Sequence, residues 1–106
     1  MHSNSVIKGT TAIITLQGRF VFDCHDTFKR LISPLLDGQA IHEIHLDFAA
    51  LDYLDSNALG MLLLLREKAQ KQGIAIHILN PSKAVMEILD MVQFDKLFTI
   101  LGPGHP

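Results

Sequence analysis

Alternating apolar and polar residues mark two segments of the chain as half-buried β-strands. In residues 11–17 and again in residues 41–48, every second residue is apolar, which places those side chains on one face of a sheet. The apolar positions are Ala12, Ile14, Leu16, Ile44, Leu46 and Phe48. Val6–Lys8 is expected to form a short edge strand that pairs with the first of these segments through a turn at Gly9.

Apolar residues spaced three and four apart predict three helices. The first contains Phe28, Leu31, Ile32, Leu35 and Leu36; the second runs from about Ser56 to Gln72; the third begins at Pro81 and Ser82 and contains Val85, Ile88, Leu89 and Val92. Asp23 is expected to cap the first helix and Gly38 to end it. Pro34 lies inside that helix and should bend or shorten it.

Two further apolar runs complete the order of elements. Ile74–Leu79 has the composition of a strand that is covered on both faces, so we expect it near the centre of the sheet, and Leu97–Leu101 is expected to be the last strand. The order β-β-α-β-α-β-α-β predicts an α/β fold, with a mixed sheet, right-handed crossovers and helices packed on it. Its 106 residues suit one domain, with an ordered core of about residues 6–101 and a flexible tail at 102–106.

Composition narrows the possible functions. Hydrophobic residues make up 48% of the chain and the net charge is −2, so the chain should fold, and nothing in its charge favours nucleic acid as a partner. The single cysteine excludes a disulfide scaffold and suits a reducing compartment. The longest apolar run, Ala58–Leu65, is too short to span a bilayer, and the first residues do not resemble a signal peptide. We therefore expect a cytoplasmic protein without a membrane span.

The segment Asp55–Gly60 joins a strand to the longest predicted helix. Either Asp55 or Ser56 can cap that helix by accepting a hydrogen bond from a first-turn amide. A helical wheel puts Ala58, Leu62, Leu65 and Ala69 on the core face, and Ser56, Gly60, Leu63, Leu64, Glu67 and Lys71 on the opposite face. An exposed hydroxyl beside two outward leucines suggests a docking surface. The alternative is that another helix covers Leu63 and Leu64.

Residues Leu54–Leu62 resemble the signature of STAS domains, in particular of bacterial anti-sigma factor antagonists, whose motif is roughly Asp-Ser-Ser/Thr-Gly-Leu-Gly. The resemblance extends over about Val6–Leu101, and one part of it is similar to a proteobacterial branch of these antagonists. The further matching residues are Gly18, Phe20, Phe22, Asp23, His25, Asn80, Pro81, Val85, Leu89, Phe94 and Phe98. The chain departs from the pattern at Asn57 and Ala58, and many relatives continue into a last helix that is not expected here.

This resemblance implies a binding module without catalytic activity or a cofactor. The family's unphosphorylated antagonists bind an anti-sigma factor that is also a serine kinase of GHKL type, and phosphorylation, here of Ser56, ends the binding; a PP2C-type phosphatase removes the phosphate. The resemblance implies that Ser56 is the phosphoacceptor, Asp55 its acidic neighbour, and that Leu59 and Gly60 shape the start of the helix. Together with the outward face of the helical wheel, this predicts the partner-binding residues Asp55, Ser56, Asn57, Gly60, Leu63, Leu64 and Glu67. The alternative within the family is a non-switching STAS scaffold or regulatory subunit of a transporter, a lipid-trafficking complex or a multi-protein signalling complex.

Other chemistries find less support in the sequence. A serine hydrolase is disfavoured because no Gly-x-Ser-x-Gly elbow surrounds Ser56. His42 and His45 are three apart on a predicted strand and should point to opposite faces, so we expect these histidines, with His25 and His77, to be surface or packing residues and no metal to be bound. Cys24 is either a reactive thiol or an ordinary small residue. The aspartates at 23, 26, 47 and 52 are either a magnesium site or caps and turn residues.

Overall fold

The computed structural model describes residues 1–38 and 40–102. The elements, in chain order, are β1 (His2–Lys8), β2 (Thr11–Phe20), the short 3₁₀ helix η1 (Phe22–Cys24), α1 (His25–Asp37), β3 (Glu43–Leu54), α2 (Ser56–Lys71), β4 (Ala75–Leu79), α3 (Lys83–Met91), the 3₁₀ helix η2 (Phe94–Lys96) and β5 (Thr99–Leu101). The predicted α/β order is confirmed. Of the predicted tail, only Gly102 is among the described residues.

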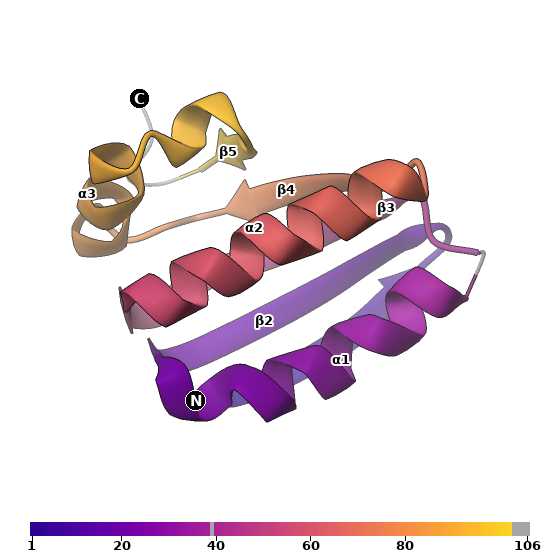
Figure 1. Cartoon of the computed structure of the whole chain (residues 1–106), viewed down its shortest axis with the longest axis horizontal. Helices are drawn as coiled ribbons and strands as arrows, with labels where there is room; N and C mark the ends of the chain where they lie inside the picture. Colours follow the sequence, from indigo (N-terminus) through magenta and orange to yellow (C-terminus); the bar gives the residue numbers. More distant parts are fainter. Residues whose placement is uncertain (39, 103–106) are drawn as a thin grey trace.

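The five strands form one mixed sheet in the order β1-β2-β3-β4-β5. β1 pairs antiparallel with β2, and the other three pairings are parallel. Figure 1 shows α1 and α2 side by side across the sheet, with α3 beyond the end of β4. Consecutive parallel strands are therefore joined by helices, as parallel pairing requires.

The hydrophobic core lies on one face of the sheet. Positions that pair across the sheet are buried together: Ala12 with Ile44 and Ile76, and Ile14 with Leu46, Ile78 and Ile100. Phe28 of α1 packs on Phe20 of β2, with ring centroids 4.8 Å apart. The alternate positions on the same strands are half-buried or exposed, so the opposite face of the sheet remains largely open.

The sheet corrects three expectations. The central strand is β3, while β4 lies between β3 and β5 and is buried on one face only, because Ala75 is exposed and His77 and Leu79 are half-buried on the other. β1 begins at His2 rather than Val6, since backbone pairing with β2 extends it through polar residues that carry no hydrophobic signal. β3 continues to Leu54, past Phe48, where irregular pairing with β2 breaks the alternation.

The start of α1 also differs from the prediction. Asp23 lies within η1, and the residue at the N-cap of α1 is Cys24, so the chain turns through a 3₁₀ segment before the helix begins. Pro34 does not shorten α1, which continues to Asp37. Pro34 is exposed, so the backbone carbonyl that it deprives of a partner lies on the solvent side of the helix. Gly38 follows the last residue of α1 as predicted, and its N–H donates to the carbonyl of Pro34.

None of the helices in residues 1–38 and 40–102 has the length and apolar character needed to cross a membrane.

Candidate functional site

The N-terminus of α2 is held by the carboxylate of Asp55. Its Oδ1 accepts a hydrogen bond from the N–H of Ala58 (2.8 Å), and its Oδ2 accepts one from the N–H of Phe22 (2.9 Å). The first bond caps α2, and the second ties the cap to the start of η1, 33 residues away in the chain. Asp55 therefore fixes α2 against the segment that precedes α1.

These hydrogen bonds lower the pKa of Asp55. The main cause is the N–H of Ala58, which stabilises the charged carboxylate; partial burial acts in the opposite direction, and the N–H groups of Phe22 and Asn57 with the Asn57 side chain lower the pKa further. Asp55 is consequently ionised at neutral pH. A fixed negative charge stands at the positive end of the α2 dipole.

Ser56 is the first residue of α2 and is exposed. The sequence left open whether Asp55 or Ser56 caps the helix, and Asp55 does. The Ser56 side chain is thus not needed as the N-cap. Its hydroxyl lies at the solvent-facing start of a helix, where a backbone dipole favours an added negative charge.

Most of the residues predicted to form the outward face of α2 are exposed in the structure. Of the residues expected to bind a partner, Ser56, Asn57, Leu63, Leu64 and Glu67 are exposed, and Asp55 and Gly60 are half-buried. Leu63 is 42% and Leu64 53% exposed, so no helix within the described part of the chain covers them. The predicted core face is confirmed as well: Ala58, Leu62, Leu65 and Ala69 are buried. Ala58, which replaces the motif's glycine, belongs to this core face.

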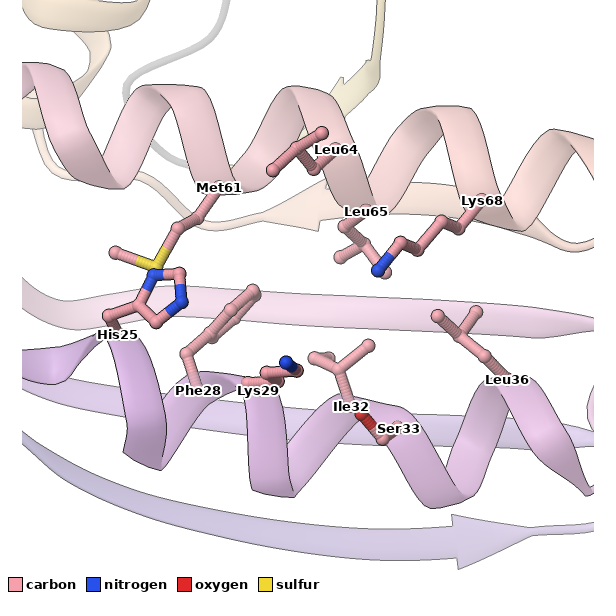
Figure 2. A pocket seen from close by; sticks show the side chains of 10 residues that line it. All are labelled: His25, Phe28, Lys29, Ile32, Ser33, Leu36, Met61, Leu64, Leu65 and Lys68. Atoms are coloured by element: carbon pink, nitrogen blue, oxygen red, sulfur yellow. The ribbon is translucent and has the colours of Figure 1, made fainter.

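A groove between α1 and α2 continues from Leu64 (Figure 2). Its volume is about 180 Å³, and it is lined by His25, Phe28, Lys29, Ile32, Ser33, Leu36, Met61, Leu64, Leu65 and Lys68. Pockets for small ligands usually measure about 300–1,000 Å³. A groove of this size suits one apolar side chain of a partner better than a cofactor.

Phe22 is a surface residue beside the site and is not among the partner-binding residues predicted from the sequence. Its side chain is 66% exposed, and its N–H donates to Asp55, so an exposed aromatic ring adjoins the start of α2. Leu63 and Leu64 lie two turns further along α2, about 10–12 Å from Ser56 along the helix axis. A bulky residue directly before a helix is a weak signal, because the sequence does not state that it is exposed.

Cys24 and the four aspartates, the other candidate groups, have structural roles or no shared site in the described part of the chain. Cys24 is buried, and its thiol donates to the carbonyl of Arg19 (3.5 Å), which fits an ordinary packing residue. Asp47 accepts from the N–H of Ala49 (3.0 Å), as a turn residue does. Within residues 1–38 and 40–102, the aspartates at 23, 26, 47 and 52 do not gather as a group of possible metal ligands.

The histidines, by contrast, are not all isolated. His45 and His77, expected to be separate surface or packing residues, lie on neighbouring strands with their rings stacked 4.9 Å apart. Glu43 lies within 3.7 Å of both rings. The spacing of His42 and His45 on one strand is visible in the sequence, whereas the register that pairs His45 with His77 is a property of the sheet.

A family model and a curated relative both identify the same kind of domain in this chain. The family model for the STAS domain matches residues 2–102. A STAS-domain containing protein of Pseudomonas aeruginosa (strain UCBPP-PA14) is 38% identical over 92 residues, which cover 87% of this chain and 89% of the relative.

Solved structures share the fold at lower sequence identity. The anti-sigma factor antagonist SpoIIAA of Bacillus is similar in its unphosphorylated form (TM-score 0.76, 20% identity, 94% of this chain and 87% of that one) and in its phosphorylated form (TM-score 0.76, 18% identity, 95% and 90%). The STAS domain of a SulP transporter from Vibrio cholerae is also similar (TM-score 0.72, 19% identity, 94% and 78%). The same fold therefore serves both kinds of protein named in these comparisons.

Proposed function

Because this chain belongs to the STAS domain family, we propose that it is an anti-sigma factor antagonist controlled by phosphorylation of Ser56. Without phosphate it binds an anti-sigma factor that is also a serine kinase of GHKL type, and phosphorylation releases it. The chain then acts by binding, in the cytoplasm, without catalytic activity of its own. The observation that carries this proposal is that Asp55 caps α2, which leaves the adjacent Ser56 exposed and free to be modified.

A phosphate on Ser56 changes the charge of this surface strongly. It adds a charge of about −1.5 to −2 next to the ionised Asp55. The amide of Ala58 is already engaged by Asp55, so fewer first-turn amides remain to offset the new charge. The helix start can accept a phosphate without unfolding, but a partner that approaches this surface must desolvate it or meet its charge.

The surroundings of Ser56 suit such a partner contact. Phe22, whose N–H binds the neighbouring Asp55, and Leu63 and Leu64, two turns along α2, supply exposed apolar area, and the groove beside Leu64 can receive a side chain. Isolated exposed leucines are common, but large apolar side chains exposed at the start of α2 and along the same helix as a modifiable group favour an interface. A thousandfold loss of affinity corresponds to about 4 kcal/mol, a magnitude that repulsion and desolvation at one central position can supply.

The comparisons support the proposal in general terms. SpoIIAA, which shares this fold, is an anti-sigma factor antagonist that has been solved both with and without phosphate. We propose in addition that a PP2C-type phosphatase reverses the modification. The SulP neighbour supports the alternative, a STAS domain that serves as a regulatory part of a larger assembly without switching.

The test uses immobilised Ser56→Ala and Ser56→Asp chains to capture proteins from a lysate of the source organism, with identification by mass spectrometry. We expect the alanine variant to retain a GHKL-type kinase that the aspartate variant loses. The purified kinase with ATP should then add one phosphate to the wild-type chain and none to Ser56→Ala.

A control variant tests whether the position of the added charge matters, and not only the change in net charge. Ser5→Asp places the same charge on the exposed edge strand β1 and should retain the kinase as the alanine variant does. If Ser56→Ala and Ser56→Asp retain the same proteins, the switch is refuted and the scaffold alternative takes its place.

A further inference from the structure

The open face of the sheet carries a row of side chains that crosses all five strands. Val6 pairs with Ile13, Ile13 with His45, His45 with His77, and His77 with Thr99. Residues that pair in register point to the same face of a sheet, and so do residues two apart on one strand. Glu43, two residues before His45, therefore joins the two histidines on the face opposite the hydrophobic core, where all three side chains are only half-buried.

The three polar groups lie close together on this face of the sheet. Oε1 of Glu43 is 3.7 Å from Nε2 of His45 and 3.7 Å from Nε2 of His77, and the three possible ligand atoms all lie within 4.8 Å of one another. The side chains are only partly exposed, 24% for each histidine and 41% for the glutamate. The group thus lies at the surface of the sheet and is partly shielded from solvent.

The hydrogen-bonding of this group is incomplete. Among the described residues, Nε2 of His45 is buried and has no hydrogen-bond partner. Its distance of 3.7 Å from Glu43 is too long for a hydrogen bond. A buried polar atom without a partner is unusual in a folded protein, and an ion or a water is a common reason for one.

We propose that Glu43, His45 and His77 bind a Zn²⁺ ion. Two imidazoles and one carboxylate form a donor set that Zn²⁺ prefers, with bonds of about 2.0–2.2 Å, so that ligand atoms around a tetrahedral ion are about 3.3 Å apart. The two observed distances of 3.7 Å are close to this value. The two rings are stacked, with 14° between their planes. Because an imidazole binds a metal in its own plane, the two rings rotate about their Cβ–Cγ bonds when the ion binds.

Such an ion would connect β3 and β4 and leave its fourth position facing solvent, where water or a partner's side chain can bind. The site lies at the N-terminal end of β3, whereas Ser56 follows the C-terminal end of the same strand. The proposal does not depend on the proposed function, because no residue is shared between the two sites.

Isothermal titration of the full chain with Zn²⁺ at pH 7.5, where free imidazole is largely neutral, tests this site. We expect one ion per wild-type chain and an affinity at least tenfold lower in His45→Gln and His77→Gln. His42→Gln is the matched control, because His42 is an exposed histidine directly before β3 and outside the cluster. It should bind Zn²⁺ as the wild type does. Tetrahedral Co²⁺ absorption should appear in the wild type and disappear in His77→Gln.

Thermal unfolding in EDTA verifies that the variants fold. Zn²⁺ should raise the melting temperature of the wild type and of His42→Gln, and raise that of His77→Gln less. If a histidine variant is unfolded, Glu43→Gln, which keeps the side-chain shape, is used in its place and should also bind more weakly. Absence of Zn²⁺ binding by the wild type, or equal binding by the wild type and His77→Gln, overturns the proposal.

Discussion

The two ends of β3 carry two different candidate sites. At its C-terminal end, Asp55 and Ser56 follow Leu54 directly in the chain, and their geometry is set by the start of one helix. At its N-terminal end, Glu43 and His45 depend on His77, which lies on another strand, and their geometry is set by the register of β3 with β4. A site made of consecutive residues is visible in the sequence, and a site made by strand register is not.

The two ends also differ in their chemistry. The Ser56 end holds a fixed carboxylate and a hydroxyl at the positive pole of a helix, so it can change its charge by covalent modification. The Glu43 end holds three side chains of kinds that bind metal ions. In our proposals, the first site regulates by repelling a partner once Ser56 is phosphorylated, and the second binds an ion that links two strands. Each can be removed without touching the other.

The largest expected effects are losses of binding at one site that leave binding at the other site unchanged. Ser56→Asp should weaken binding of the kinase captured by Ser56→Ala about a thousandfold, because the charge stands in the contact, and should leave Zn²⁺ affinity unchanged. His77→Gln should do the reverse. Titration calorimetry of each variant with the kinase and with Zn²⁺ measures all four values. A tenfold or larger loss of kinase affinity in His77→Gln would show that the ends of β3 are coupled.

A second prediction concerns Gly60, which lies one turn after Ser56 on the outward face of α2. Apart from its chain neighbours and the nearby backbone of α2, a methyl group at this position would meet no atom of the described residues within 4 Å, so the fold itself does not require glycine here. Gly60→Ala should therefore raise the free energy of unfolding by about 1 kcal/mol, since alanine is the better helix former, and urea unfolding measures it.

Gly60→Ala also tests whether the partner binds to this face of α2. If the partner's backbone approaches Gly60 closely, Gly60→Ala should weaken kinase binding although the chain is more stable. Lys71→Ala, on the same face at the far end of α2, is the control and should bind normally. Unchanged kinase binding by Gly60→Ala would place the contact elsewhere.

Local sequence information was sufficient for much of this molecule. The period of apolar residues located the helices, and the wheel of α2 placed Leu62 in the core and Leu63 at the surface, because both follow from the geometry of one helix. Asp55 and Ser56 were both recognised as possible caps, and only the three-dimensional structure selected Asp55.

Properties that depend on distant segments were not predicted. The polar start of β1 is a strand because β2 pairs with it, and β4 was expected to be central although its half-buried face carries His77. The second contact of Asp55, to the N–H of Phe22, joins segments 33 residues apart. The expectation that His45 and His77 are surface or packing residues did not include their contact, because that contact follows from the strand register.

The smallest expected effect concerns the Asp55 cap and its dependence on pH. The folded pKa of Asp55 is lowered below the ordinary value of about 3.9. The carboxylate therefore stabilises the fold fully above about pH 4, and this contribution is lost as the pH falls through the lower folded pKa. In Asp55→Asn the amide oxygen can still cap α2, but the NH₂ group cannot accept from Phe22.

We expect Asp55→Asn to melt a few degrees below the wild type at pH 7, and the difference to shrink as the pH falls below 4. Circular dichroism melts from pH 7 to pH 2.5 measure this difference. The exposed Asp52→Asn, three residues earlier, controls for removal of one carboxylate near this helix start. A difference in melting temperature that is the same at every pH would mean that the side-chain charge of Asp55 does not stabilise the start of α2. The start of α2 would then be held by hydrogen-bond geometry alone. Control by charge at the Ser56 end of β3 would come from the proposed phosphate on Ser56 and not from Asp55.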